Sequence, residues 1–200
     1  MVQPISSAWW VDSVQTFWFE ELERAAWFTQ DSDIDAIILA RFLALHEHVV
    51  RHLDCNVAAI SSEQAVASVI VLDQFPRNMF RGTPQAFATD HLALALAYNA
   101  IDQKLDHGLD KNRRLFLYLP FEHSEELTNQ NRAVALISDL GDDKWTDYAI
   151  AHRDIIARFG RFPHRNVILG RPSTPDEIEF LQQSDDAFWT AKGSRGSLSS

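Results

Sequence analysis

The chain has 200 residues, enough for one domain with a hydrophobic core of its own. Its net charge of −10 argues against general nucleic-acid binding, because neutralising phosphates requires a basic surface. The single cysteine, Cys55, excludes a disulfide within the chain, and apolar runs such as Ala65–Leu72 are too short to span a membrane. We therefore expect a cytoplasmic protein with one domain over residues 1–190 and a flexible, glycine- and serine-rich tail at 191–200.

Helix signals run along almost the whole chain, whereas the alternation typical of strands is missing. In the N-terminal part, capping residues and apolar periodicity predict three helices. They run from the Ser6-Ser7 cap to about Arg24, from Asp33 to about Asp54, and from Ser61 to the residue before Pro76. Ser61 and Gln64 have the spacing of a capping box, and Pro76 is expected to end the third helix.

Five further helices are predicted after Pro76 from caps, glycines and prolines. They begin at Thr83 and end at Gly108, run through Lys111–Tyr118 before Pro120, through Ser124–Leu140 and Asp143–Phe159, and start again at Thr174. About eight helices joined by short loops predict an all-α, antiparallel array.

One polar motif occurs twice. Asp73-Gln-Phe-Pro-Arg-Asn-Met-Phe-Arg-Gly-Thr-Pro84 is echoed by Gly160-Arg-Phe-Pro-His-Arg-Asn-Val-Ile-Leu-Gly-Arg-Pro-Ser-Thr-Pro175. Each copy follows an apolar helical run and ends at a Thr-Pro helix start. Arginine and asparagine are therefore expected at two similar helix-to-loop junctions, which we call corners. The repeat suggests two related halves. The residues that it offers for ligand binding are Arg77, Asn78, Arg81, Arg161, His164, Arg165 and Asn166.

Asp73 follows the apolar stripe of its helix, so its carboxylate is expected to point toward the core. A buried carboxylate without a partner costs about 3–5 kcal/mol, so Asp73 should pair with an arginine, Arg77 or Arg165 by preference. Such a pair would either fix how the two corners meet or orient an arginine whose free face binds a ligand.

Glu122 and His123 lie in the segment Leu119–Glu125, which the pattern places at the start of a helix. Backbone N–H groups at such a position favour an anion, although a capping role is the alternative. A loop histidine beside acidic residues also titrates near neutrality, which makes His123 a candidate acid–base group. His152 lies on an apolar stripe and is interpreted as a core histidine.

Arginine outnumbers lysine by fourteen to four, and ten arginines lie between Arg77 and Arg171. Their planar, forked donors suit carboxylates and phosphates, although ordinary pairing with aspartate would use them equally well. No motif for a nucleotide, a metal or a nucleophilic serine is present, so we predict no metal site and no cofactor. The six tryptophans fit either a core or a self-association surface.

Three segments resemble the bacterial family known as domain of unknown function 924. They are Leu72–Asn78 with Arg81-Gly82, Leu119–Glu125 and His152–Asn166, and the match continues into Phe17-Trp-Phe19 and Trp27-Phe28. The resemblance covers most of residues 17–181 and implies a right-handed helical array similar to tetratricopeptide folds. It implies no activity and no catalytic residues.

Three functions are compatible with these residues. The first is a binding module whose polar cleft, lined by the motif residues with Asp73, Glu122 and His123, holds an anionic small molecule or an acidic peptide. The second is a purely structural network. The third is an enzyme that uses His123 or His164 for acid–base chemistry and an arginine to hold an anion.

Overall fold

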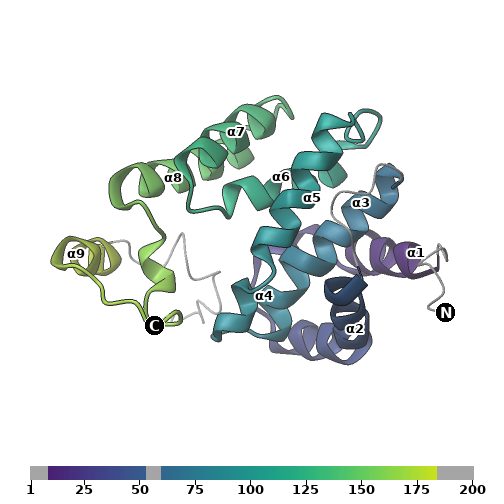
Figure 1. Ribbon diagram of the computed structural model, residues 1–200, viewed down its shortest axis with the longest axis horizontal. Helices are drawn as coiled ribbons and strands as arrows, with labels where there is room; N and C mark the ends of the chain where they lie inside the picture. The colour runs from purple at the N-terminus through teal and green to yellow at the C-terminus, as the bar shows by residue number, and fades with distance from the viewer. Residues whose placement is uncertain (1–8, 53–59, 184–200) are drawn as a thin grey trace, which may run out of the picture.

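A computed structural model describes residues 9–52 and 60–183, and these residues form helices and turns without a strand (Figure 1). The all-α prediction is therefore confirmed. The α-helices are α1 Trp9–Thr16, α2 Ser32–His52, α3 Ser62–Val69, α4 Phe75–Met79, α5 Asp90–Asp102, α6 Lys111–Glu122, α7 Leu127–Ser138, α8 Asp143–Phe159 and α9 Pro175–Gln183. The π-helical turns η1 Phe17–Glu21 and η3 Ile70–Gln74 extend these helices. The 3₁₀ turns between them are η2 Arg24–Phe28, η4 Pro84–Phe87 and η5 Pro163–Arg165.

The core is built around α3, which contacts α1, α5 and α6. Its buried residues include Val66, Val69 and the large aromatic side chains of Trp18, Phe75 and Phe116. Helix α2 packs on α4, and α7 packs on both α6 and α8. A second, smaller apolar cluster joins the end of α8 to α9 through Ile156, Phe159, Phe162 and Phe180.

Several predicted caps are confirmed. The Ser61 hydroxyl accepts a hydrogen bond from the Gln64 amide, and Asp110 accepts bonds from the amides of Asn112 and Arg113. Helix α8 has the predicted bounds and ends at Gly160, whose φ of +68° is the left-handed conformation that favours glycine. The Ser6-Ser7 cap and the tail at 191–200 lie outside the described residues.

Two predicted helix ends are wrong, and both involve proline. The helix from Ser61 does not stop before Pro76, because the wide turn η3 carries the chain from α3 directly into α4. Helix α6 likewise contains Pro120 and continues to Glu122. Burial in the core holds these segments helical despite the missing N–H: Phe75 is buried before Pro76, and Leu119 and Phe121 are buried on either side of Pro120.

Other boundaries also differ, among them the end of α5, which lies at Asp102 and not at Gly108. The first helical stretch ends at Glu21, since Leu22 is extended, and does not reach Arg24. Thr83 precedes only the short turn η4, and its hydroxyl donates to the carbonyl of Phe80 instead of capping. Helix α7 begins at Leu127 rather than at Ser124. None of the described helices is long and apolar enough to cross a membrane.

Candidate functional site

Asp73 is the centre of a buried polar cluster. The wide turn η3 adds a residue to the helix and leaves the Asp73 side chain fully buried. Its carboxylate lies 3.2 Å from Nη1 of Arg77 and 2.8 Å from Nδ1 of His123, and it accepts a bond of 2.5 Å from the Gln74 amide. Burial would raise the pKa of Asp73, but Arg77 and His123 outweigh it and lower the pKa to about 2. The predicted pairing of Asp73 with an arginine is confirmed for Arg77.

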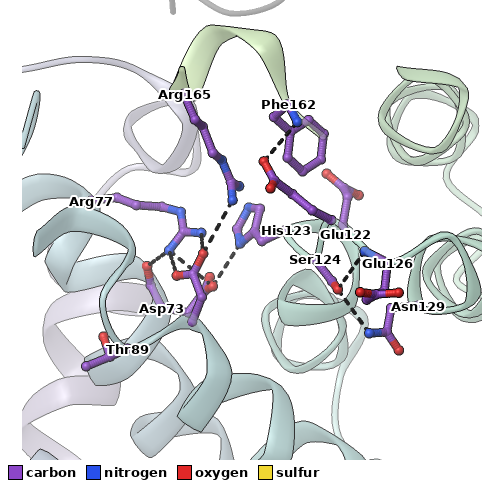
Figure 2. A network of polar contacts seen from close by, with 12 residues as sticks. Asp73, Arg77, Thr89, Glu122, His123, Ser124, Glu126, Asn129, Phe162 and Arg165 are labelled. Carbon is purple, nitrogen blue, oxygen red and sulfur yellow. Dashed lines mark hydrogen bonds and ion pairs between the residues drawn. The ribbon is translucent and has the colours of Figure 1, made fainter. Parts of the chain in front are cut away.

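A row of opposite charges extends from Asp73 across four elements (Figure 2). Arg77 in α4 forms two hydrogen bonds, of 2.9 and 3.0 Å, with Asp90 at the start of α5. Asp90 in turn lies 3.6 Å from Nη1 of Arg165 in η5. The two Phe-Pro motifs therefore bring one arginine each to the same carboxylate, although the motifs are far apart in the sequence.

Arg165 is buried, and one of its donors, Nε, has no hydrogen-bond partner in the described part of the chain. Its guanidinium lies 4.7 Å from the ring centre of Phe87 and 4.5 Å from that of Phe162. Within residues 9–52 and 60–183, its buried Nε has no hydrogen-bond partner, and the nearest carboxylate oxygen, on Asp90, lies beyond normal hydrogen-bond length. Burial, followed by the charge of Arg77, lowers the pKa of Arg165 to about 10, so the group stays charged at neutral pH.

His123 approaches the cluster from the end of α6. Because Asp73 is ionised and can only accept, Nδ1 of His123 must carry the proton that joins the two groups. Burial, followed by the charge of Arg77, lowers the pKa of His123, which keeps the ring neutral at pH 7. In that tautomer Nε2 has a free lone pair, and the side chain is 16% exposed.

Glu122 precedes His123 and is also buried. Its Oε1 lies 3.4 Å from Nδ1 of His152, a nitrogen that is 2.8 Å from the carbonyl of Tyr148. Burial, followed by the charge of Asp73, raises the pKa of Glu122 to about 8. Burial lowers the pKa of His152 to about 3. At neutral pH the pair is therefore a protonated carboxyl group beside a neutral imidazole.

The predicted position of Glu122 and His123 at a helix start is wrong. Since α6 continues through Pro120, Glu122 is its last residue and His123 its C-cap. The carbonyl end of a helix disfavours a nearby anion, so the anion-binding argument from a helix dipole no longer applies to these residues. Ser124 instead accepts a hydrogen bond from the Glu126 amide ahead of α7.

His164 lies in η5 next to Arg165, with its ring centre 5.5 Å from that of Phe162. Burial, followed by the charge of Arg165, lowers the pKa of His164 to about 3. The polar cluster thus comprises Asp73, Arg77, Asp90, Glu122, His123, His152, His164 and Arg165.

The other predicted motif residues form two outer corners with a common pattern. Around Asp35, Asn78 donates one hydrogen bond and Arg81 donates two. The second corner is centred on the buried Glu177 in α9. Asn166 donates one hydrogen bond to this carboxylate and Arg161 donates two. In each corner an asparagine and an arginine of the motif hold one carboxylate, so these four residues are engaged away from the polar cluster.

Sequence reasoning missed Asp90 and gave His152 no part in a site. Asp90 follows Thr89 at the start of α5. Acidic residues are common in the first turn of a helix, so nothing in the sequence marked Asp90 as part of a site. Its role arises only because α4 and η5 both reach it.

The described surface also contains a shallow depression of about 440 Å³, but not at the polar cluster. It lies over the second corner and is lined by Arg158, Phe159, Arg161, Thr174, Asp176 and Glu177. At the polar cluster, the side chains of Arg77, Asp90 and His123 are partly exposed.

Comparisons with known proteins agree with the resemblance of the motifs. The sequence profile of a family described as bacterial protein of unknown function (DUF924) matches residues 14–185. The fold is similar to the solved structure of a protein of unknown function from Agrobacterium tumefaciens, with 39% identity and a TM-score of 0.82 over 88% of this chain and 99% of that chain. No curated protein matches the sequence.

Proposed function

Since the chain belongs to the bacterial family of unknown function DUF924, which brings no activity with it, we propose from the geometry that it binds a small organic or inorganic anion at the polar cluster. Arg165 supplies the binding donors, and the neighbouring imidazoles line the ligand. The binding is expected to take place in the cytoplasm, and a helical array similar to tetratricopeptide folds remains the expected framework.

The unsatisfied Nε of Arg165 carries this proposal. A buried guanidinium normally satisfies its N–H groups, because leaving them without partners costs several kcal/mol when the charge is desolvated. Arg77 follows this rule with two bonds to Asp90, whereas the Nε of Arg165 has no partner among the described residues. A carboxylate or phosphate could bind the fork of Arg165 in the bidentate manner that guanidinium groups favour.

The rest of the cluster favours a small ligand over an acidic peptide. Asp73, Asp90 and Glu125 already offset the charges of Arg77 and Arg165, so an anion gains from the unsatisfied Nε of Arg165 rather than from a broad positive field. The two aromatic rings beside Arg165 also restrict the approach to the edge of its guanidinium plane. A compact oxyanion satisfies both conditions.

Ligand-induced stabilisation tests the proposal. We would measure thermal unfolding at constant ionic strength while inorganic phosphate, sulfate or citrate replaces chloride. A ligand that binds only the folded state stabilises it by about 2.7 kcal/mol at a hundredfold excess over its Kd. We expect at least one of the three anions to raise the melting temperature of the wild type and to lose this effect in Arg165→Met.

Arg158→Met is the matched control. Arg158 also stacks on two phenylalanine rings, those of Phe159 and Phe180, but it lies beside the depression at the second corner. This variant should keep the full response to the anion. A response lost in Arg158→Met and kept in Arg165→Met would move the site to the depression. If no anion stabilises the wild type beyond chloride, the network is structural and the proposal fails.

A further inference from the structure

We propose that the anion held by Arg165 is a substrate, and that His123 is the general base and Glu122 the proton donor of a proton-transfer reaction on it. This inference rests on the proposed anion site and adds chemistry to it. The substrate class that fits the three groups is a small 2-oxo carboxylate.

His123 has the geometry of a positioned base. The bond of 2.8 Å to Asp73 fixes the ring and places its proton on Nδ1. The buried carboxylate is itself held by Gln74 and Arg77, so the orientation of the imidazole does not depend on solvent. In the described part of the chain, no hydrogen bond uses Nε2 of His123. Asp73 is accordingly a positioning residue, and His123 is the residue that would touch the substrate.

Glu122 complements His123 at the same end of α6. Its carboxyl group, 3.4 Å from His152, is buried in a place where the protonated form predominates at neutral pH. A protonated carboxyl group can donate to an oxygen, whereas the neutral imidazole of His123 can accept from a carbon or an oxygen. Two neighbouring groups whose environments shift their proton affinities in opposite directions are the usual mark of an acid–base pair.

Arg165, Glu122 and His123 share charged and polar neighbours. The charge of Arg165 acts on His152, which is next to Glu122, and the charge of Asp73 acts on Glu122 as well as on His123. In Figure 2, Arg165 points toward the end of α6 that carries Glu122 and His123. An anion on Arg165 would therefore present its neighbouring atoms to this end of α6.

The residue types of the cluster point to proton transfer rather than to covalent catalysis. Within residues 9–52 and 60–183, its contacts involve carboxylates, guanidinium groups, imidazoles and the Gln74 amide, and no lysine, cysteine or serine side chain. His123 would remove a proton from the carbon next to the carbonyl of the 2-oxo acid. The C–H electron pair forms the C=C bond of an enol, and the carbonyl oxygen takes the proton of Glu122. The reverse step restores all atoms, so no further reactant is needed.

The test is deuterium uptake from D₂O. Pyruvate and 2-oxobutyrate are incubated with the full-length protein, and loss of the C3 proton signal is followed by NMR. We expect exchange above the buffer rate for at least one of them, falling about a hundredfold or more in His123→Gln, the range typical of a lost general base. His91→Gln, which changes an exposed histidine on α5, is the control and should exchange at the wild-type rate.

Two further variants keep the result interpretable. Glu122→Gln should also lose exchange, and it serves in place of His123→Gln if that variant does not fold. Arg165→Met should require a higher 2-oxo acid concentration for the same rate. Exchange that persists in folded His123→Gln excludes His123 as the base.

The two proposals fail in different ways. If pyruvate raises the melting temperature of the wild type but no exchange exceeds that of buffer, the anion site stands and the catalytic inference is wrong. If neither 2-oxo acid binds or exchanges while phosphate binds, the substrate class is wrong. If no anion binds at all, both proposals are wrong.

Discussion

Arg77 and Arg165 approach the same carboxylate, Asp90, but only Arg77 forms hydrogen bonds with it. Arg77 also lies 3.2 Å from Asp73, and it donates to the Asp73 carbonyl as well. Arg165 is more deeply buried than Arg77, with 8% of its side chain exposed against 19%. The arginine with less access to water thus makes fewer hydrogen bonds, which is the opposite of what stability alone would favour.

This contrast predicts different effects on stability for the two arginines. Arg77→Met removes the main cation beside the fully buried Asp73, and such a loss costs about 3–5 kcal/mol. Arg165→Met keeps the packing between Phe87 and Phe162 and removes a desolvated charge, so its free energy of unfolding should change little or increase. Urea unfolding of both variants measures the difference. An equally large loss of unfolding free energy in both variants would show that Arg165 stabilises the fold.

Glu122→Gln should stabilise the protein, and increasingly so as the pH rises. The pKa of Glu122 is raised from 4.5 to about 8 in the folded state, so between these values the unfolded chain has released a proton that the folded protein retains. Stability therefore falls with rising pH in this window, by about 1.4 kcal/mol per unit. The glutamine amide has nearly the same shape as the protonated carboxyl group and stays neutral over this pH range.

At pH 7 the expected gain from Glu122→Gln is on the order of 3 kcal/mol. Urea titrations at pH 5, 6, 7 and 8 would reveal it as a difference that grows with pH. Glu126→Gln, at an exposed residue ahead of α7, is the control and should show no such trend. A constant difference would show that Glu122 is ionised in the folded protein.

His164→Asn should protect the protein against acid. The folded pKa of His164 is about 3 and the ordinary value is 6.5, so below pH 6.5 the unfolded chain binds a proton that the folded protein does not. This group makes the wild type less stable as the pH falls from 6.5 toward 3, by roughly 2 kcal/mol at pH 5. The variant should lose less stability than the wild type between pH 7 and 5. An unchanged pH profile would contradict the burial of a neutral His164.

Glu177→Gln should loosen the docking of α9 while leaving the polar cluster intact. The Glu177 carboxylate accepts bonds from Arg161, Asn166 and the Thr174 amide, and the bonds from Arg161 contribute most to lowering its pKa to about 2. We expect faster amide hydrogen exchange in Pro175–Gln183 and no change in the response to phosphate. A lost response to phosphate would connect the second corner to the site.

Asp35→Asn is the counterpart at the first corner, where Asn78 and Arg81 hold Asp35. If the two corners stabilise helix packing in the same way, Asp35→Asn should make amide hydrogen exchange faster in α2 and α4. Faster amide hydrogen exchange in only one of the two variants would show that the two copies of the motif have different roles.

Much of the architecture is encoded locally and could be predicted from the sequence. Caps such as Ser61 and Asp110, and the glycine that ends α8, act within one turn of helix, so their effects do not depend on the rest of the chain. The pairing of Asp73 with Arg77 also follows from a helical spacing of four residues. Proline was misleading at Pro76 and Pro120, where burial in the core outweighed its local preference.

The sequence by itself determined the helical class, most helix starts, the need of Asp73 for an arginine, and the two Phe-Pro motifs as the sources of the polar side chains. Only the tertiary structure decided which of those side chains meet. It brought Arg165 to Asp90, joined Glu122 to His152, and assigned Asn78, Arg81, Arg161 and Asn166 to two outer corners. Such choices depend on contacts between helices distant in sequence, and no local spacing can specify them, because many pairings of like residues satisfy the same local chemistry.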